Sequence, residues 1–196
     1  MIRQAELSDL NDIVRIRESV TIDMDRLDDL EYRVDMQRNG FLLPSGPNAE
    51  ELREELSQYS VSEHEEQVVG SFYVHADQII PQEQNVFWLK PNLRDAYYSS
   101  PQGRIGGISV SPDSRQKGVA TEMLHAAEKR FRAEGIHWLF AFIVLTPVTN
   151  FASMMFHEKN GFDRVATSSP YLFEAGNGFQ IEGYQFMLYG KQLAEA

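Results

Sequence analysis

Between residues 119 and 134 the apolar residues recur three or four positions apart, as they do on one side of an amphipathic helix. The residues of this row are Ala120, Met123, Leu124, Ala127 and Phe131. Gly135 follows the row, and glycine favours the backbone conformation that ends a helix. The pattern therefore predicts a helix that ends near Glu134.

A different pattern flanks this helix, in which apolar residues follow one another almost without interruption. Residues 138–145 form such a run, which is typical of a strand covered on both faces. Residues 104–110 also indicate a strand, and the pair Gly106 and Gly107 in it indicates a bulge or a close backbone approach. The central part of the chain is therefore predicted to run strand, helix, strand.

Shorter segments extend this pattern toward both ends of the chain. Strands are expected at 2–5, 59–62, 67–75, 162–166 and 184–189, and helices at about 10–17, 24–38, 49–58 and 151–159. Strands flank helices in the centre, and hairpins lie toward the ends. We therefore predict a mixed-sheet α/β or α+β fold in a single domain of residues 1–196.

Residues 76–102 are the least regular part of the chain, and we predict that they form a long insertion. They contain three prolines and an aromatic-rich piece at 86–98, part of which is compatible with an extra strand. Long ordered loops often act as lids or partner surfaces. The aromatic residues fit either the wall of a binding pocket or the surface of a homodimer, and both interpretations stay open.

The composition excludes several classes of protein. The chain has no cysteine, so disulfides and thiol catalysis are excluded, and it has no apolar run near the ~20 residues of a membrane-spanning helix. Its start lacks a secretory signal pattern, so we expect a cytoplasmic protein without a membrane partner. The net charge of −11 argues against nucleic-acid binding. The same charge would help attract a cationic amine, although solubility explains it equally well.

One basic turn interrupts this acidic chain, at residues 115–121 between the central strand and the helix. A turn that leads into a helix offers backbone N–H groups to an anion. Arg115 and Lys117 would oppose the helix dipole, which prefers negative charge at its start, unless a bound anion supplies that charge. The turn is therefore either an anion site or an ordinary polar turn before a surface helix.

Two motifs about 30 residues apart resemble the acyl-CoA signature of the GNAT acetyltransferases. The first is Ile-Ser-Val-Ser-Pro at 108–112 with Arg-Gln-Lys-Gly-Val-Ala at 115–120, similar to the family's apolar strand and Arg/Gln-x-x-Gly-x-Gly/Ala. The second is Asn150 with Phe-His-Glu-Lys-Asn-Gly-Phe at 156–162, similar to the family's Asn…Tyr-Glu-Lys-x-Gly-Phe. The order of the predicted elements also agrees with the family from residue 1 to about 190.

The resemblance implies a mixed, mostly antiparallel sheet flanked by helices, in which two central parallel strands at 104–111 and 137–145 splay apart. It also implies acetyl-CoA as co-substrate, with its pantetheine along one strand and its pyrophosphate on N–H groups of the basic turn. The implied contacts are Ile108, Ser109, Val110, Arg115, Gln116, Lys117, Gly118, Val119, Ala120, Thr121, Asn150 and Phe156. Gly118 would permit a close backbone approach, and Asn150 would in addition cap the last helix.

Phe156 is the point at which the chain departs from the family pattern. Many members have at this position a tyrosine that is thought to protonate the leaving thiolate, and phenylalanine has no proton to give. His157 is adjacent, but one residue turns a helix by about 100°, so His157 is not expected to reach the same point. The general acid is therefore another group or water, or it is absent, since a thiolate is a fair leaving group.

The implied reaction is direct attack of an amine on the thioester, with N–H groups of the 108–110 strand polarising its carbonyl. A protonated alkyl amine must first lose a proton to a base. The candidates for this base, chosen for titratable chemistry and approximate placement, are Tyr73, His75, Glu31 and Tyr184. The histidines are scattered without ligand spacing, so no metal site is predicted.

The sequence is compatible with three hypotheses about the function. The leading hypothesis is an N-acetyltransferase that acts on a small-molecule amine whose identity the sequence does not reveal. Phe156 motivates the alternative, a non-catalytic acyl-CoA-binding or regulatory module. A third hypothesis is an interaction protein whose insertion at 76–102 drives assembly. Release of CoA in the presence of amines would separate the first two.

Overall fold

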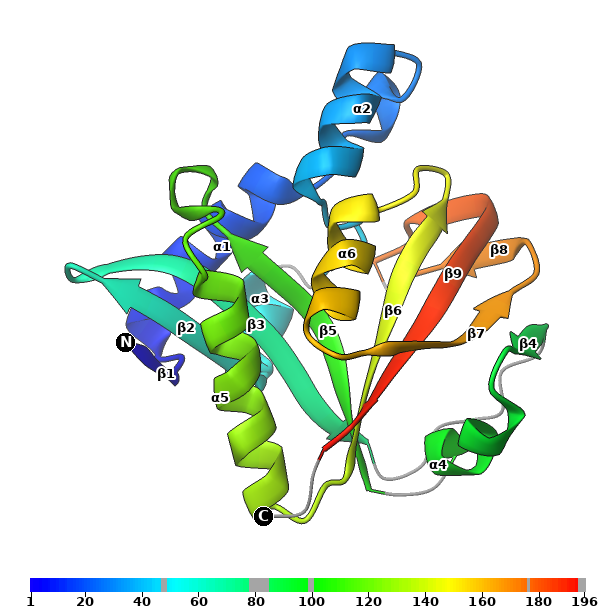
Figure 1. Cartoon of the computed structure of the whole chain (residues 1–196). Coiled ribbons are helices and arrows are strands. Elements are labelled where there is room, and N and C mark those ends of the chain that lie inside the picture. Colours follow the sequence, from blue (N-terminus) through cyan, green and yellow to red (C-terminus); the bar gives the residue numbers. More distant parts are fainter. Residues whose placement is uncertain (47–48, 78–84, 99–100, 176, 194–196) are drawn as a thin grey trace.

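Strands and helices alternate in the central part of the chain, at residues 86–168 (Figure 1). The computed structural model describes residues 1–46, 49–77, 85–98, 101–175 and 177–193. The strands are β1 (Ile2–Gln4), β2 (Tyr59–His64), β3 (Gln67–Asp77), β4 (Val86–Trp88), β5 (Gln102–Val110), β6 (Trp138–Thr146), β7 (Asp163–Ser168), β8 (Tyr171–Glu174) and β9 (Gln180–Gln192). The α-helices are α1 (Leu10–Val20), α2 (Leu30–Asn39), α3 (Ala49–Glu54), α4 (Arg94–Tyr98), α5 (Val119–Ala133) and α6 (Phe151–Lys159). Short 3-10 turns occur at Leu7–Asp9, Met24–Arg26, Leu56–Gln58, Pro91–Leu93 and Pro112–Ser114.

One mixed sheet runs through the molecule in the order β1-β2-β3-β5-β6-β9-β7-β4, and β8 pairs with β9 beside this path. Neighbouring strands are antiparallel except β5 and β6, which are parallel. Two parallel neighbours need a crossover connection, and α5 provides it. The predicted mixed, mostly antiparallel sheet with flanking helices is therefore confirmed.

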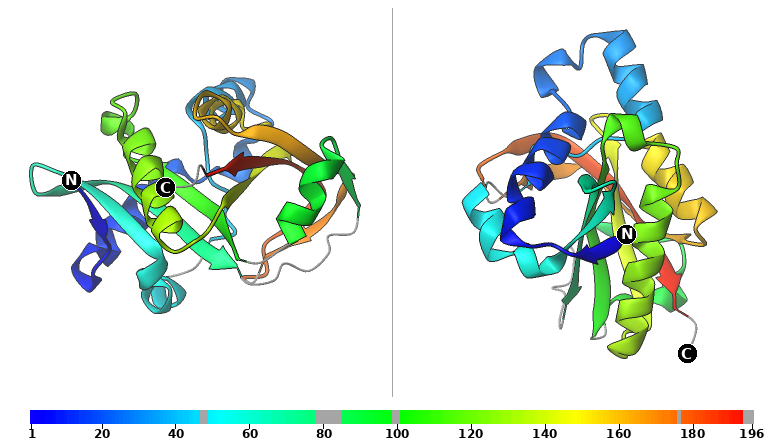
Figure 2. Two further views of the ribbon diagram at one scale, coloured as in Figure 1. Left: turned by 60° about the horizontal axis from the view of Figure 1, so that its bottom comes forward. Right: turned by 90° about the vertical axis from the view of Figure 1, so that its left-hand side faces the viewer.

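Helices cover both faces of this sheet. α5 and α6 lie on one face, and α1 and α3 lie on the other (Figure 2). The predicted apolar row of α5 forms the first core, where Met123, Leu124 and Phe131 are fully buried against the sheet. On the opposite face Ile13 and Ile16 of α1 pack against β2. Within the described ranges, no helix combines the length and the apolar character that a membrane crossing requires.

Several elements differ from the expectation. The helix predicted at 24–38 is divided into a 3-10 turn at Met24–Arg26 and α2, because the side chain of Asp29 accepts a hydrogen bond from the Tyr32 N–H and begins a new helix. The segment Tyr171–Glu174, for which no element was predicted, forms β8. β8 pairs with the first half of β9, which is longer than the strand predicted at 184–189.

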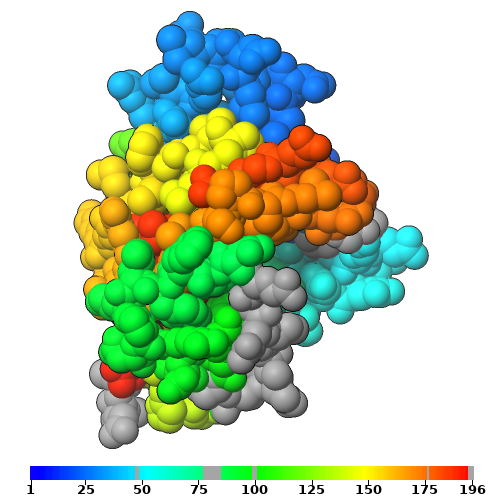
Figure 3. All heavy atoms as spheres, turned by 90° about the vertical axis from the view of Figure 1, so that its right-hand side faces the viewer, coloured from blue at the N-terminus to red at the C-terminus, as the bar shows by residue number. Residues whose placement is uncertain are grey.

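The insertion predicted at 76–102 crosses to the far edge of the sheet. Its strand β4 pairs with β7, so the expected extra strand is confirmed, and Figure 3 shows β4 and α4 in green beside β7 and β8 in orange. Trp88 and Tyr97 belong to a second core cluster, in which the Tyr97 and Phe140 ring centroids lie 5.0 Å apart. Trp88 and Tyr97 therefore support the fold, whereas Phe87 is exposed. Its residues 78–84 and 99–100 lie outside the described residues.

Gly103 offers a test of the packing between α5 and the parallel strands. A Cβ atom at this position would lie 2.4 Å from Cδ2 of Leu139 and 3.0 Å from Cε2 of Phe131, and both side chains are fully buried. Overpacking of this kind costs about 1–3 kcal/mol. We expect Gly103→Ala to lower the free energy of unfolding by that amount. In urea unfolding this appears as a lower midpoint with an unchanged slope of the transition.

Gly107→Ala is the matched control in the same strand. Its Cβ would make an ordinary contact, 3.6 Å from Cδ2 of Leu42. An equal loss of stability in both variants would contradict the packing explanation.

Candidate functional site

The two central strands separate partway along their length. β5 pairs with β6 only where residues 103–105 lie beside 139–141, whereas its pairing with β3 continues to Val110. The register with β3 shifts at the same place, since Tyr73 pairs with Gly107 and Val74 pairs with Ile105, which leaves Gly106 as a bulge. The predicted splay and bulge are both confirmed. Among the described residues no strand pairs with the β6-facing edge of β5 after Ile105.

A cavity of about 800 Å³ occupies the gap between the separated strands. Its lining includes Ile108 and Ile143, which pack into the core under α5 and α6, and also Tyr73 and Phe142, which belong to the clusters of the opposite face. The cavity therefore passes through the sheet. α5 and α6 border it on one face and β8 borders it on the other, and the loop after α2, which contacts α6 at Gly40 and Phe41, also lines it.

The basic turn forms the start of α5 and borders the cavity. Gln116 and Gly118 have positive φ angles of 61° and 86°, and no side chain of the described chain caps the helix at Gly118. A hydrogen bond from the Glu122 N–H to the Gly118 carbonyl, 3.0 Å long, closes the first turn of α5. The N–H groups of residues 119–121 therefore have no partner inside the helix. Such a concave set of N–H groups suits an anion.

The cationic residues of the turn lie in different surroundings. Arg115 lines the cavity and is partly buried, whereas Lys117 is exposed and does not line it. Burial lowers the pKa of Arg115, and the nearby Asp35 opposes this effect. An arginine stays charged in proteins, so a bound anion would relieve the cost of this partial burial.

Most of the predicted site residues come together around the cavity. Apart from Lys117, the predicted cofactor contacts that line it are Ile108, Ser109, Val110, Arg115, Gln116, Gly118, Val119, Ala120, Thr121, Asn150 and Phe156. Of the base candidates, Tyr73, His75 and Tyr184 line it. Glu31 is exposed on α2 and does not line it.

The three base candidates at the cavity lie on the face opposite α5. The Tyr73 and His75 rings stack with centroids 5.3 Å apart. The Tyr73 ring also covers the bulge, because a Cβ atom at Gly106 would lie 2.2 Å from its Cδ1. Tyr184 is buried, with its ring centroid 4.7 Å from that of Phe173. Their role as bases stays a prediction.

Phe156 and His157 occupy adjacent positions of α6 and differ in environment. Phe156 is partly buried and packs against the core beside the cavity. His157 is almost fully buried, and its Nδ1 lies 2.7 Å from the Ser153 carbonyl oxygen. A carbonyl only accepts, so Nδ1 carries the proton, and Nε2 has no hydrogen-bond partner in the described chain. Burial lowers the pKa of His157 to about 4, so it is neutral at neutral pH and its only proton is already engaged.

Asn150 joins two segments that border the cavity. Its Oδ1 accepts a hydrogen bond from the Ser153 N–H at 3.1 Å, which confirms the predicted helix cap. Its Nδ2 donates to the Phe41 carbonyl at 2.9 Å and so ties the loop after α2 to α6. The contact of Asn150 with pantetheine stays a prediction.

Sequence reasoning missed the residues of α1 and β2 at this site. Arg17 lines the cavity and donates a hydrogen bond from Nη1 to the hydroxyl of Tyr59, which also lines it. Burial raises the pKa of Tyr59 to about 12, so this phenol keeps its proton. Arg104, also missed, lies over the Phe142 ring at 4.7 Å. No motif marks these residues, because their proximity depends on how α1 docks on the sheet.

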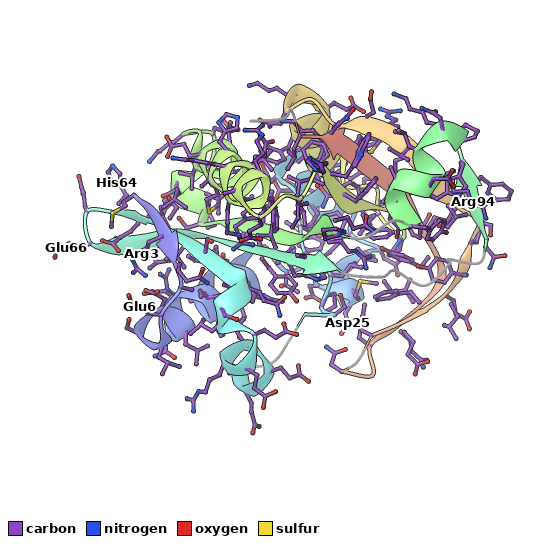
Figure 4. All side chains as sticks on the ribbon, turned by 90° about the horizontal axis from the view of Figure 1, so that it is seen from below. Arg3, Glu6, Asp25, His64, Glu66 and Arg94 are labelled. Carbon is purple, nitrogen blue, oxygen red and sulfur yellow. The ribbon has the colours of Figure 1, made fainter. Side chains whose placement is uncertain are left out.

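The histidines away from the cavity lie on the surface. His64, His125 and His137 are exposed, and Figure 4 shows His64 at the outer end of the β2–β3 hairpin. Within the described ranges, no three His, Asp or Glu side chains are grouped so that they could hold a metal ion.

Comparison with known proteins gives the same picture of the fold. The model of a family described as "Acetyltransferase (GNAT) family" matches residues 24–162, which is more than half of the chain. The crystal structure of the Escherichia coli ribosomal-protein-S18-alanine N-acetyltransferase has a TM-score of 0.60 and 11% identity, with 100% of this chain and 95% of that chain covered. No curated protein matches the chain significantly.

Two liganded structures are also similar to the chain. For Chaetomium thermophilum Naa20 in complex with a bisubstrate analogue, the TM-score is 0.61 and the identity 13%, with 98% of this chain and 86% of that chain covered. For Neisseria gonorrhoeae N-acetylglutamate synthase complexed with coenzyme A and N-acetyl-glutamate, the TM-score is 0.57 and the identity 18%, with 100% of this chain and 35% of that chain covered. At these identities the likeness concerns the fold.

The buried His157 makes stability depend on pH. The folded chain holds this pKa at about 4, against an ordinary value of 6.5, so the unfolded chain binds more protons between these pH values. Stability therefore falls as the pH is lowered from 6.5 toward 4, by roughly 3 kcal/mol from this residue. Urea unfolding at several pH values should show a smaller loss for His157→Gln than for the original chain.

His125→Gln is the matched control, since His125 is exposed on α5. It should keep the original pH dependence. The same acid loss in the original chain and in His157→Gln would contradict the assignment.

Proposed function

The chain belongs to the GNAT family of acetyltransferases, and from this premise we propose that it transfers an acetyl group from acetyl-CoA to the amine of a small acceptor. The observation that carries the proposal is the cavity between β5 and β6, which joins the uncapped start of α5 to a group of titratable side chains. A donor with a long anionic arm fits the part of the cavity at the start of α5. An acceptor fits the part that the titratable side chains line.

The donor side of the proposal rests on the turn and on the edge of β5. The N–H groups of residues 116–121, together with Arg115, would hold the pyrophosphate of acetyl-CoA. The pantetheine carries amide groups, and the edge of β5 at 108–110 offers backbone N–H and C=O groups that β6 does not pair with. The thioester would then point along β5 toward the Gly106 bulge.

The chemistry follows from what surrounds that bulge. The amine nitrogen attacks the thioester carbonyl carbon, the C–N bond forms, and the C–S bond breaks. The nitrogen loses its proton to a base, for which Tyr73, His75 and Tyr184 are the candidates. CoA leaves as a thiolate, and it takes no proton from position 156, because Phe156 has none to give.

Phe156 also supports a second candidate, a non-catalytic acyl-CoA-binding module. The two functions predict different behaviour of the same protein. A module binds acetyl-CoA and leaves it intact, whereas an acetyltransferase releases CoA when a suitable amine is present.

Calorimetry with acetyl-CoA, followed by an assay of free CoA thiol with a panel of amines, tests the proposal. We expect saturable binding and amine-dependent CoA release. Tight binding without release for any amine would favour the module, and no binding at millimolar acetyl-CoA would refute both functions.

A matched pair of glycines tests the phosphate-binding turn. Gly118 and Gly135 lie at the two ends of α5 and have positive φ angles of 86° and 75°, and a Cβ atom at either position would meet no other part of the described chain within 4 Å. Alanine at either site therefore costs a similar backbone strain of about 1 kcal/mol. Only Gly118→Ala adds a methyl group to the turn, so only this variant should weaken acetyl-CoA binding, by about tenfold for each 1.4 kcal/mol of lost contact. Equal affinities of the two variants in calorimetry would show that the turn does not hold the pyrophosphate.

A further inference from the structure

The lining of the cavity has the opposite charge to the chain as a whole. The chain contains 29 Asp and Glu against 18 Lys and Arg, yet the described residues that line the cavity include no Asp or Glu. Its charged lining residues are Arg17, Arg38, Arg104, Arg115 and Lys159. The field in a cleft depends mainly on the groups that line it. The net charge of −11 therefore does not make this cavity attractive to a simple cation.

Three of these cations fit the phosphates of acetyl-CoA. Arg115 belongs to the turn before α5, and Lys159 lies on α6, which borders the cavity on the same face. Arg38 is on α2, close in the chain to Asp35, whose charge acts on Arg115. The proposed donor thus accounts for the positive charge on this side.

Arg17 lies on the other face and needs a different explanation. α1 packs against the side of the sheet that is opposite α5, and Arg17 donates to the Tyr59 hydroxyl. Tyr59 pairs with Tyr73 across the strands, with ring centroids 4.7 Å apart, and Tyr73 pairs with Gly107. Arg17 is therefore at the level where β5 and β6 separate, on the side of the base candidates.

The Arg17 guanidinium lies against Gly46. A Cβ atom at Gly46 would lie 1.6 Å from its Nη2, so a glycine at this position leaves the space that the guanidinium occupies. In the part of the chain that the structure describes, no Asp or Glu forms an ion pair with Arg17. Glu55 acts electrostatically on Tyr59 but does not line the cavity. A partly buried guanidinium without a carboxylate partner suits an anionic group of a ligand.

Tyr59 adds a second donor beside Arg17. Its hydroxyl oxygen already accepts the hydrogen bond from Arg17. Tyr59 is almost fully buried but lines the cavity, and its phenol keeps its proton, so it can donate its own hydrogen to a ligand oxygen that enters there. Arg104 lines the same side of the cavity and adds positive charge.

We propose that the acceptor is a small amine that also carries a carboxylate, as a free amino acid does, and that Arg17 and Tyr59 bind this carboxylate. A guanidinium and a hydroxyl donor hold a carboxylate in a fixed orientation. The amine of the same molecule then faces Tyr73, His75 and the Gly106 bulge. This inference rests on the proposed acetyltransferase function and names the class of its acceptor.

Matched pairs of acceptors test the class. The CoA-release assay is run with the common amino acids and with the amines that remain when their carboxylates are removed, such as phenylalanine with phenethylamine, tyrosine with tyramine, and lysine with cadaverine. The expected result is a kcat/KM at least about tenfold higher for the amino acid of at least one pair, since a charge-assisted hydrogen bond is worth about that factor or more.

Variants test the residues. Arg17→Met should raise the KM for the preferred amino acid by about 10- to 100-fold and should reduce its advantage over the paired amine. Tyr59→Phe, which keeps the ring, should do the same to a smaller degree. Acetyl-CoA affinity in calorimetry should stay unchanged in both. Arg15→Met is the control on the same helix, because Arg15 is exposed and pairs with Asp12 at 2.7 Å.

The outcomes separate this inference from the function on which it rests. A preference for the amines without carboxylate, or an unchanged preference in Arg17→Met, overturns the inference and leaves the acetyltransferase function in place. Acetyl-CoA binding without turnover of any amino acid also overturns it. Failure to bind acetyl-CoA refutes the proposed function itself.

Discussion

Backbone N–H and C=O groups inside a protein need hydrogen-bond partners, and the separation of β5 from β6 removes these partners in the middle of the sheet. The outer edges of both strands remain paired, β5 with β3 and β6 with β9. Each half of the sheet is thus held together from outside while the inner edges stay apart. A ligand with amide groups of its own is the kind of molecule that such an edge can pair with.

Other features of the structure depend on this gap. The bulge at Gly106 lies at the point of separation and leaves room for the Tyr73 ring. α5 begins beside the gap with its N–H groups uncapped. Asn150 joins the start of α6 to the loop after α2 by its hydrogen bond to the Phe41 carbonyl. His157 of α6 is buried beside the gap, and its ring fills the core between Phe156 and Phe162.

The elements around the gap could be predicted because their signals are local. The apolar row of α5, the apolar run of β6 and the Gly106–Gly107 pair each identify an element or a bulge from neighbouring residues. The contact between Arg17 and Tyr59 joins residues 42 positions apart and depends on the space at Gly46, so no local pattern contains it. Glu31 was selected for its titratable chemistry, but the direction of a side chain depends on the rotation of its element.

The passage of the cavity through the sheet bears on the kinetic order of the proposed reaction. Different elements border it on the two faces, with α5 and α6 on one and Tyr73 of β3 with Phe173 of β8 on the other. Two substrates that approach from opposite faces do not obstruct each other. Either one would then bind first, and affinity and concentration, rather than access, would set the sequence of binding and of product release.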